Sequence, residues 1–154
     1  MHRAVDADRT GGGLMPSASD VPVPSDLPLL SRVVTPEAVK AYADAGGDQN
    51  PLHQDEAFAR AAGFPGIIAH GMFTMGHLAA CLSKWAGGPE RIRCLTAQFR
   101  APVFMGEEIV AGGRVKEVDV EQRVAVIECW VTVERDGKTE WPIKRGEAEV
   151  LLDP

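Results

Sequence analysis

Several features that mark large classes of proteins are missing from this sequence of 154 residues. Its three cysteines, Cys81, Cys94 and Cys129, lack the spacing of metal ligands and are odd in number, so neither a zinc site nor a disulfide framework is expected. We expect three reduced, buried thiols, as in a cytoplasmic protein. No window reaches the roughly 18 uncharged apolar residues of a membrane span, and the first residues lack the basic and apolar regions of a secretory signal.

Positive charge is also in short supply. The formal net charge is −6, and the 16 lysines and arginines are scattered along the chain rather than gathered in one stripe. Nucleic acid and anionic membranes are therefore not expected as partners, although a local basic rim could hold an anionic ligand. Apolar residues make up 45% of the chain and charged residues 25%, a balance that predicts one globular domain with its own core.

The first part of the chain lacks regular periodicity. Residues 1–25 are rich in glycine, serine, proline and aspartate, and this composition predicts a flexible N-terminal arm. Met15, within this arm, is a second possible translation start. The domain itself is predicted to occupy residues 26–154.

Two helices with a polar loop between them are predicted next. Thr35-Pro36-Glu37 combines a capping hydroxyl, a proline and an acid, and predicts the start of a helix that ends at Gly46-Gly47. A second, short helix is predicted over residues 55–62. The stretch 48–53 between them holds a carboxylate, an amide, a proline and an imidazole, and we interpret it as an active-site loop.

The second half of the sequence predicts one buried helix followed by strands. Residues 72–85 are apolar on nearly every side, which predicts a helix buried on most of its faces. The apolar pattern then alternates, which predicts strands over residues 91–101, 109–118, 124–133 and 141–152. Asp136-Gly137 predicts a hairpin turn between the last two. This order predicts an α+β fold in which a curved antiparallel sheet wraps the helix. Three residues of the 124–133 strand are expected to leave apolar surface for another subunit: Val124, Val126 and Trp130.

The polar loop also has a plain structural interpretation. Asp48 and Asn50 beside a proline are common turn formers, because their side chains satisfy nearby backbone groups. His53 in the same loop and Gly71 at a buried helix start favour a site, since a helix N-terminus offers free N–H groups and a positive dipole end. Two polar or nucleophilic residues of the helix are expected to serve packing only: His77 and Cys81.

Several motifs follow one another in order over residues 27–118. They are Tyr42, Gly47-Asp48-x-Asn50-Pro51-Leu52-His53, Asp55, Ile68-Ala69-His70-Gly71-Met72 and Phe99-Arg100-Ala101-Pro102-Val103-x-x-Gly106. Together they resemble the MaoC-like (R)-specific enoyl-CoA hydratases and dehydratases, and most strongly the hydratase subunits of bacterial fatty-acid and mycolic-acid elongation. Two positions depart from the pattern: Gly46 stands where a hydroxyl residue is common, and Glu107-Glu108 stands where an aspartate is usual.

The resemblance implies a hot-dog fold, with a long central helix wrapped by the sheet, and a dimer whose sheets join edge to edge. It implies hydration of a trans-2-enoyl thioester, or the reverse dehydration of a (3R)-hydroxyacyl thioester. Asp48 and His53 are then the acid–base pair that acts on water, and the Gly71 backbone amide stabilises the enolate oxygen. Supporting or substrate-binding roles are expected for Asn50, His70 and Met72. Neither a metal nor a cofactor beyond the coenzyme A thioester substrate is expected.

Two other functions are less consistent with the sequence. A hot-dog thioesterase places its acid on the central helix or sheet, whereas residues 72–85 contain no aspartate or glutamate. A non-catalytic acyl-binding subunit could dispense with the loop residues that this chain retains. The sequence does not determine the acyl length. It also does not decide between coenzyme A and acyl carrier protein as the carrier, or between a heterodimer and the expected homodimer. Arg91, Arg93 and Arg100 could meet the substrate's phosphates or simply lie on a solvated sheet edge.

Overall fold

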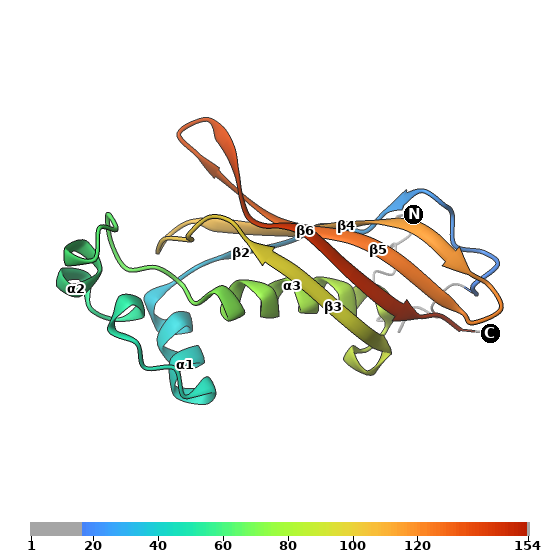
Figure 1. Ribbon diagram of the computed structural model, residues 1–154, viewed down its shortest axis with the longest axis horizontal. Coiled ribbons are helices and arrows are strands. Elements are labelled where there is room, and N and C mark those ends of the chain that lie inside the picture. The colour runs from blue at the N-terminus through green and yellow to red at the C-terminus, as the bar shows by residue number, and fades with distance from the viewer. Residues whose placement is uncertain (1–16, 154) are drawn as a thin grey trace, which may run out of the picture.

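The computed structural model describes residues 17–153, in which an antiparallel sheet lies along one side of a long helix (Figure 1). Most of the predicted N-terminal arm, with Met15, lies outside these residues. In the part that is described, Ala18 and Val21 are buried, and the Ala18 N–H donates to the Asp153 carbonyl at 3.2 Å. This short stretch therefore packs beside the C-terminal end of the chain.

The first helices begin and end where their capping residues predict. In α1 (Pro36–Gly46), the Ala38 N–H donates to the Thr35 hydroxyl at 3.2 Å, and the helix stops at Gly47, whose φ of 78° is left-handed. A 3₁₀ turn, η1 (Pro51–His53), follows. The short α2 (Glu56–Ala61) is capped by Asp55. These three elements gather at the end of the molecule where the long helix starts (Figure 1).

The long helix α3 (Gly71–Ala86) confirms the predicted central helix. One of its faces packs under the sheet and is buried: Phe73, Thr74, His77, Leu78, Cys81, Leu82 and Ala86. Met72, Gly76 and Ala80 are exposed, so within one chain α3 is not buried on most sides as predicted. The reason is that the sheet covers only one side of it (Figure 1). No helix among residues 17–153 is long and apolar enough to cross a membrane.

The sheet is entirely antiparallel and is ordered β1-β4-β5-β6-β3, with β2 also paired to β4. Its strands are β1 (Ser25–Asp26), β2 (Leu30–Val33), β3 (Ile92–Phe99), β4 (Glu108–Asp119), β5 (Val124–Arg135) and β6 (Lys138–Leu151). A second 3₁₀ turn, η2 (Pro89–Arg91), connects α3 to β3. The predicted turn Asp136-Gly137 joins β5 to β6, with both residues at positive φ. Strand β3 pairs only with β6, so its other edge is free within the described residues.

Two details of the predicted packing are wrong. Val124 is buried rather than outward-facing, whereas Val126 and Trp130 are half-buried. Cys94 is exposed on β3, while Cys81 and Cys129 are buried as expected. Burial raises the pKa of the Cys129 thiol to about 12 and also raises that of Cys81. Both errors concern residues of the sheet. The alternating pattern of a strand shows which residues share a face, but it does not show which parts of that face another segment covers.

Candidate active site

The polar loop between α1 and α2 is held by its own side chains. The Asn50 N–H donates to Asp48 Oδ1 at 3.1 Å, and the Leu52 N–H donates to Asn50 Oδ1 at 3.0 Å. Both residues are therefore turn formers, and Asn50 caps η1. This structural role uses only Oδ1 of Asp48. The other carboxylate oxygen, Oδ2, makes no hydrogen bond to the described residues. The carboxylate is exposed and stays available to a ligand.

His53 is held in one orientation by the segment that leads to α3. Its Nδ1 lies 2.7 Å from the Ile68 carbonyl oxygen. A carbonyl only accepts, so Nδ1 carries the hydrogen, and in the neutral ring Nε2 keeps a free lone pair. A base that is fixed in direction and has a free lone pair can take a proton from water.

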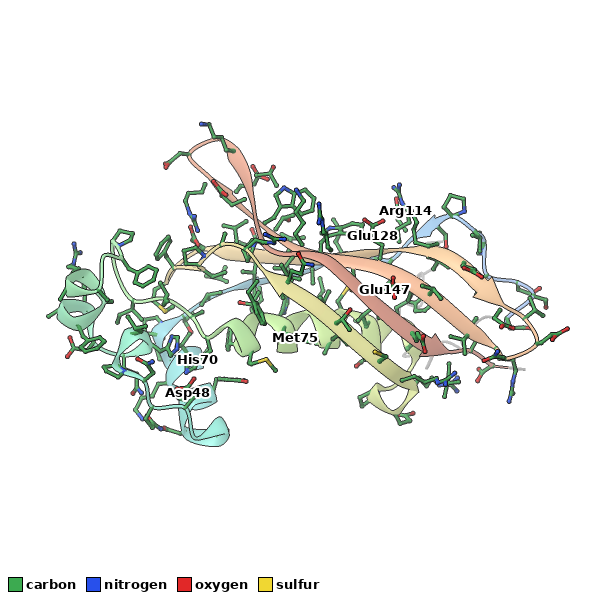
Figure 2. The ribbon with its side chains drawn as sticks, viewed as in Figure 1. Asp48, His70, Met75, Arg114, Glu128 and Glu147 are labelled. Carbon is green, nitrogen blue, oxygen red and sulfur yellow. The ribbon has the colours of Figure 1, made fainter. Side chains whose placement is uncertain are left out.

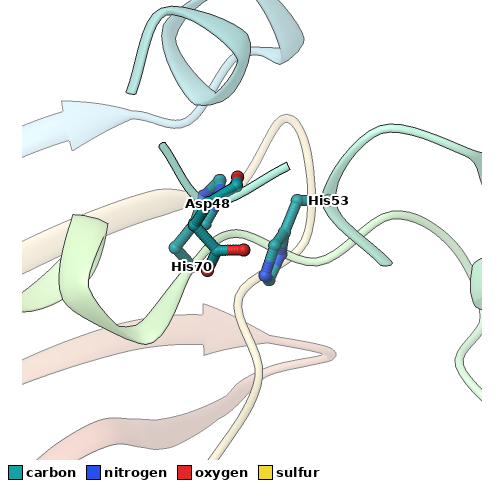
Figure 3. A group of neighbouring side chains, drawn as sticks. All are labelled: Asp48, His53 and His70. Carbon is teal, nitrogen blue, oxygen red and sulfur yellow. The ribbon is translucent and has the colours of Figure 1, made fainter. Parts of the chain in front are cut away.

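His70 contacts both members of the predicted acid–base pair. Its ring is stacked on that of His53, with centroids 3.7 Å apart and planes inclined by 29°. Its Nε2–H donates to the Asp48 carbonyl at 3.1 Å. The centroid of the His70 ring lies 5.0 Å from that of the Tyr42 ring. Figure 3 shows the three side chains side by side at the start of α3. His70 is only 2% exposed, and its Nδ1 has no partner among the described residues.

The start of α3 supplies a backbone donor. The Phe73 and Thr74 N–H groups both donate to the His70 carbonyl, whereas the Gly71 N–H has no acceptor among the described residues. Such a free N–H at the positive end of a 16-residue helix attracts developing negative charge. A Cβ at position 71 would lie 3.2 Å from Phe99 Cε1, so glycine keeps this approach open.

Gly71 forms part of the wall of a cavity of about 300 Å³, here called the Gly71 pocket. Its lining is mostly apolar and comes from the segment before α3, from α3, from the end of β3 with the connection to β4, and from β6: Phe64, Ile68, Ala69, Gly71, Thr74, Phe99, Arg100, Ala101, Pro102, Val103 and Pro142. Apolar walls with one free N–H suit an acyl thioester better than a charged metabolite.

The loop 102–107 holds the segment before α3 in place. The Ala69 N–H donates to the Val103 carbonyl at 2.8 Å, which fixes the segment that orients His53. Glu107 in turn accepts two hydrogen bonds from Arg135, at 2.7 and 2.9 Å, and Arg135 also donates to the Pro102 carbonyl at 3.0 Å. The hydrogen bonds to Glu107 raise the pKa of Arg135. Sequence reasoning missed this pair, and its only signal was the unusual Glu107-Glu108 after Gly106.

The side-chain ligand atoms of Asp48, His53 and His70 lie within 4.8 Å of one another, and such residues can also bind metals. In each histidine one ring nitrogen donates to a backbone carbonyl, which leaves the other nitrogen free to accept a proton or to bind a metal. The three groups therefore have the chemistry for either proton transfer or metal binding.

The remaining predicted residues are placed as follows. His77 donates from Nε2 to the Leu30 carbonyl at 2.8 Å, which confirms a hydrogen-bonded core histidine. Met72 is exposed and is not part of the Gly71 pocket. Arg91 is paired with Asp153, and Arg93 is exposed on β3, whereas Arg100 lines the pocket. Of the three candidate phosphate ligands, only Arg100 is therefore at the site.

Comparisons with known proteins show the family of this chain. Residues 25–138 match the family model described as a MaoC like domain. The 3-hydroxybutyryl-CoA dehydratase of Methylorubrum extorquens is 34% identical over 106 residues, which cover 68% of each chain.

Two solved structures share the fold. The (R)-hydratase from A. caviae involved in PHA biosynthesis is 27% identical with a TM-score of 0.78, over 87% of this chain and 98% of that one. A protein titled MaoC-like dehydratase is 30% identical with a TM-score of 0.79; the match covers 99% of this chain and about half, 52%, of the other. The predicted hot-dog fold, a sheet wrapped on a long helix, is confirmed.

Proposed function

The chain belongs to the family of MaoC-like domains, and from this premise we propose that it is an enoyl-thioester hydratase of (R) specificity. It adds water to a trans-2-enoyl thioester or removes water from the (3R)-hydroxyacyl thioester. The observation that carries the proposal is the close grouping of the Asp48, His53 and His70 side chains, because His70 immediately precedes Gly71 and its unpartnered N–H.

Water is handled by the Asp48 and His53 pair. His53, oriented through its Nδ1–H, accepts a hydrogen bond from water at Nε2, and a free oxygen of Asp48 accepts the second. The water oxygen bonds to the β-carbon of the substrate while the pair takes one of its protons. The pair then delivers a proton to the α-carbon, so that the whole water molecule is added.

Charge on the substrate is stabilised by the start of α3. As the new bond forms at the β-carbon, negative charge develops on the thioester oxygen. We assign the Gly71 N–H as its donor, because it is unpartnered, lies at the positive end of α3 and faces an apolar pocket. The reaction requires neither a metal nor a cofactor besides the thioester itself.

The two alternative functions are less well supported. The described length of α3 carries no carboxylate with which a thioesterase could attack its substrate. Two relatives that this chain covers over 68% and 83% of their length are named 3-hydroxybutyryl-CoA dehydratase and (R)-specific enoyl-CoA hydratase. A purely acyl-binding subunit has no use for a histidine held with its Nε2 free, and that arrangement is present here.

The proposed assembly is a homodimer. The exposed apolar face of α3, with Met72, Gly76 and Ala80, and the free edge of β3 are surfaces that a second copy would cover. Light scattering on the purified protein should give the mass of two chains, and a monomeric mass would contradict this. The cytoplasmic location stays a prediction of the sequence.

Two variants test the function. Asp48→Asn keeps the Oδ1 acceptor that closes the turn but removes the charge, and His53→Ala removes the base. Each should lower the rate of crotonyl-CoA hydration by about 10²–10⁴-fold with an unchanged circular dichroism spectrum. Glu56→Gln is the matched control, because Glu56 is an exposed carboxylate on the neighbouring α2 that pairs with Arg60. Normal turnover in either of the first two variants would overturn the acid–base assignment.

A further inference from the structure

A second hollow, the Trp141 recess, opens directly beside the Gly71 pocket. It has a volume of about 340 Å³ and is lined by Arg100, Ala101, Glu140, Trp141, Lys144 and Arg145. Arg100 and Ala101 line both hollows, and Pro142, the neighbour of Trp141 in the chain, lines the Gly71 pocket. A ligand bound at Gly71 can therefore extend from the Gly71 pocket past Arg100 and Ala101 into the Trp141 recess.

The cations of the recess are presented by a β-bulge in β6. Ile143 pairs with Val131 and Gly146 with Cys129, so β6 has one more residue than β5 at this point. Arg145 sits in the bulge with a φ of 53°, a conformation that residues other than glycine rarely adopt. The extra residue interrupts the alternation of the strand, and Lys144 and Arg145 are both exposed as a result. Bulges of this kind often re-aim side chains next to active sites.

The charges of the recess are not neutralised by the protein. Among residues 17–153, no salt bridge involves Arg100, Lys144 or Arg145. Arg114, by contrast, pairs with Asp26, and Lys116 pairs with Glu128. Glu140 is the one acid in the lining, so the recess keeps an excess of positive charge on a chain whose net charge is −6.

The recess also offers an aromatic surface. Lys144 Nζ lies 5.6 Å from the centroid of the Trp141 ring. A further hollow of about 380 Å³ shares Trp141, Lys144 and Arg145 and extends to Trp130. It lies on the face of the sheet turned away from α3, where Figure 2 labels Arg114 and Glu128. Cations beside indole rings are suited to a ligand that carries both phosphate and a flat base.

We propose that the Trp141 recess binds the nucleotide end of coenzyme A, with its phosphates at Arg100, Lys144 and Arg145 and its adenine against Trp141. This rests on the proposed function, which places the thioester at Gly71. The pantetheine arm would then run past Arg100 and Ala101, which the two hollows share. An acyl carrier protein brings a single phosphate and no adenine, so the aromatic part of the recess favours coenzyme A as the natural carrier.

A pair of substrates separates the recess from the catalytic residues. Crotonyl-CoA and crotonyl-pantetheine present the same reacting atoms, but the second lacks phosphates and adenine. Arg145→Ala and Trp141→Ala should each raise KM for crotonyl-CoA about tenfold, as expected for the loss of a charge-assisted or stacking contact. Neither should change kcat/KM for crotonyl-pantetheine. A variant that was merely misfolded would lose activity on both substrates.

Arg123→Ala is the matched control for Arg145→Ala. Arg123 is also an exposed arginine with positive φ, 57°, but it lies in the turn between β4 and β5 and in neither hollow. It should behave as the unaltered protein on both substrates. Equal effects of Arg145→Ala on the two substrates, or none, would overturn the proposal. A loss confined to crotonyl-acyl carrier protein would also overturn it, in favour of a protein carrier.

Calorimetry with free coenzyme A tests the recess without turnover. The unaltered protein should bind coenzyme A about tenfold more tightly than the Arg145→Ala protein. If neither crotonyl thioester is hydrated but this difference holds, the proposed function fails and the recess stands. If both are hydrated and the difference is missing, the recess fails and the function stands.

Discussion

The imidazole ring of His70 lies stacked on that of His53, with the ring centroids 3.7 Å apart. The same buried ring donates a hydrogen bond to the Asp48 carbonyl at 3.1 Å. One residue therefore sets the position of both members of the proposed acid–base pair. The His70 side chain has no direct route to substrate, since it is only 2% exposed. We consider it a positioning residue.

Replacing His70 by phenylalanine should separate these two roles. A phenyl ring can still stack on His53, but it cannot donate to the Asp48 carbonyl, so the loop is freer to move. We expect kcat for crotonyl-CoA hydration to fall between about fivefold and a hundredfold, with KM nearly unchanged. Steady-state kinetics measure this, with circular dichroism to verify the fold. An unchanged kcat would show that the hydrogen bond to Asp48 is dispensable.

Removing the guanidinium of Arg135 should loosen the loop that braces the site. Arg135→Met removes the charged partner of the Glu107 carboxylate, whose side chain is only 16% exposed, and leaves it the Phe104 N–H as donor. The free energy of unfolding should fall by about 1–3 kcal/mol, and kcat should fall with it because Ala69 and Ile68 are held through this loop. Urea unfolding and steady-state kinetics measure the two effects.

Arg114→Met is the control for this prediction. Arg114 also pairs with a carboxylate, that of Asp26, but both side chains are at least half exposed and lie far from the polar loop in the chain. Solvent screens such a pair, so the substitution should leave kcat unchanged and alter stability little. If Arg114→Met lowered kcat as much as Arg135→Met, a specific role of the Glu107 pair would be disproved.

The sequence predicted those parts of the fold that depend on neighbouring residues. The Thr35 cap, the stop at Gly47 and the Asp136-Gly137 turn are local, and each appears as predicted. The polar loop was also found, because its residue types are concentrated within a few positions.

Features that depend on strand register or on distant pairing were missed. Glu107 and Arg135 lie 28 positions apart in the sequence, and no local pattern links them. The bulge at Arg145 shifts the register inside a strand that the sequence predicts as uninterrupted. The exposure of Cys94 and the open face of α3 likewise depend on which side of an element the rest of the chain covers.

Thiol chemistry should distinguish the three cysteines. Burial raises the pKa of Cys129 to about 12 and raises that of Cys81, so neither forms much thiolate near neutral pH. Only the exposed Cys94 should react rapidly with an aromatic disulfide reagent in the native protein. The expected result is one fast equivalent per chain, with all three reacting after denaturation. Cys94→Ser should abolish the fast phase, and a fast phase that persists would contradict the described burial.

Stability should depend on pH through His77. Burial lowers the pKa of this imidazole from its ordinary value of 6.5, despite the opposing effect of its hydrogen bond to Leu30. The unfolded chain therefore binds a proton that the folded chain does not, and the free energy of unfolding falls as the pH drops below about 6.5. The fall ends where the folded protein also takes up the proton.

His77→Gln tests this assignment, because glutamine can still donate to the Leu30 carbonyl but does not titrate. Urea midpoints at pH 7.5 and 5.5 should differ less for this variant than for the unaltered protein. Identical pH dependence in the two proteins would exclude His77 as the source.

Asp48 and His53 lie against His70, the neighbour of Gly71, within a single chain, and on the proposed assignment this has a consequence for genetics. Two defective alleles, one encoding Asp48→Asn and the other His53→Ala, cannot complement each other, because no pairing of their products contains an intact site. A duplicated gene could accordingly lose its loop residues and survive as a structural partner, while the undamaged copy in the proposed dimer keeps the complete set of proposed catalytic groups. Such mixed assemblies would retain one working centre each, so activity would fall in proportion to the dose of the intact allele.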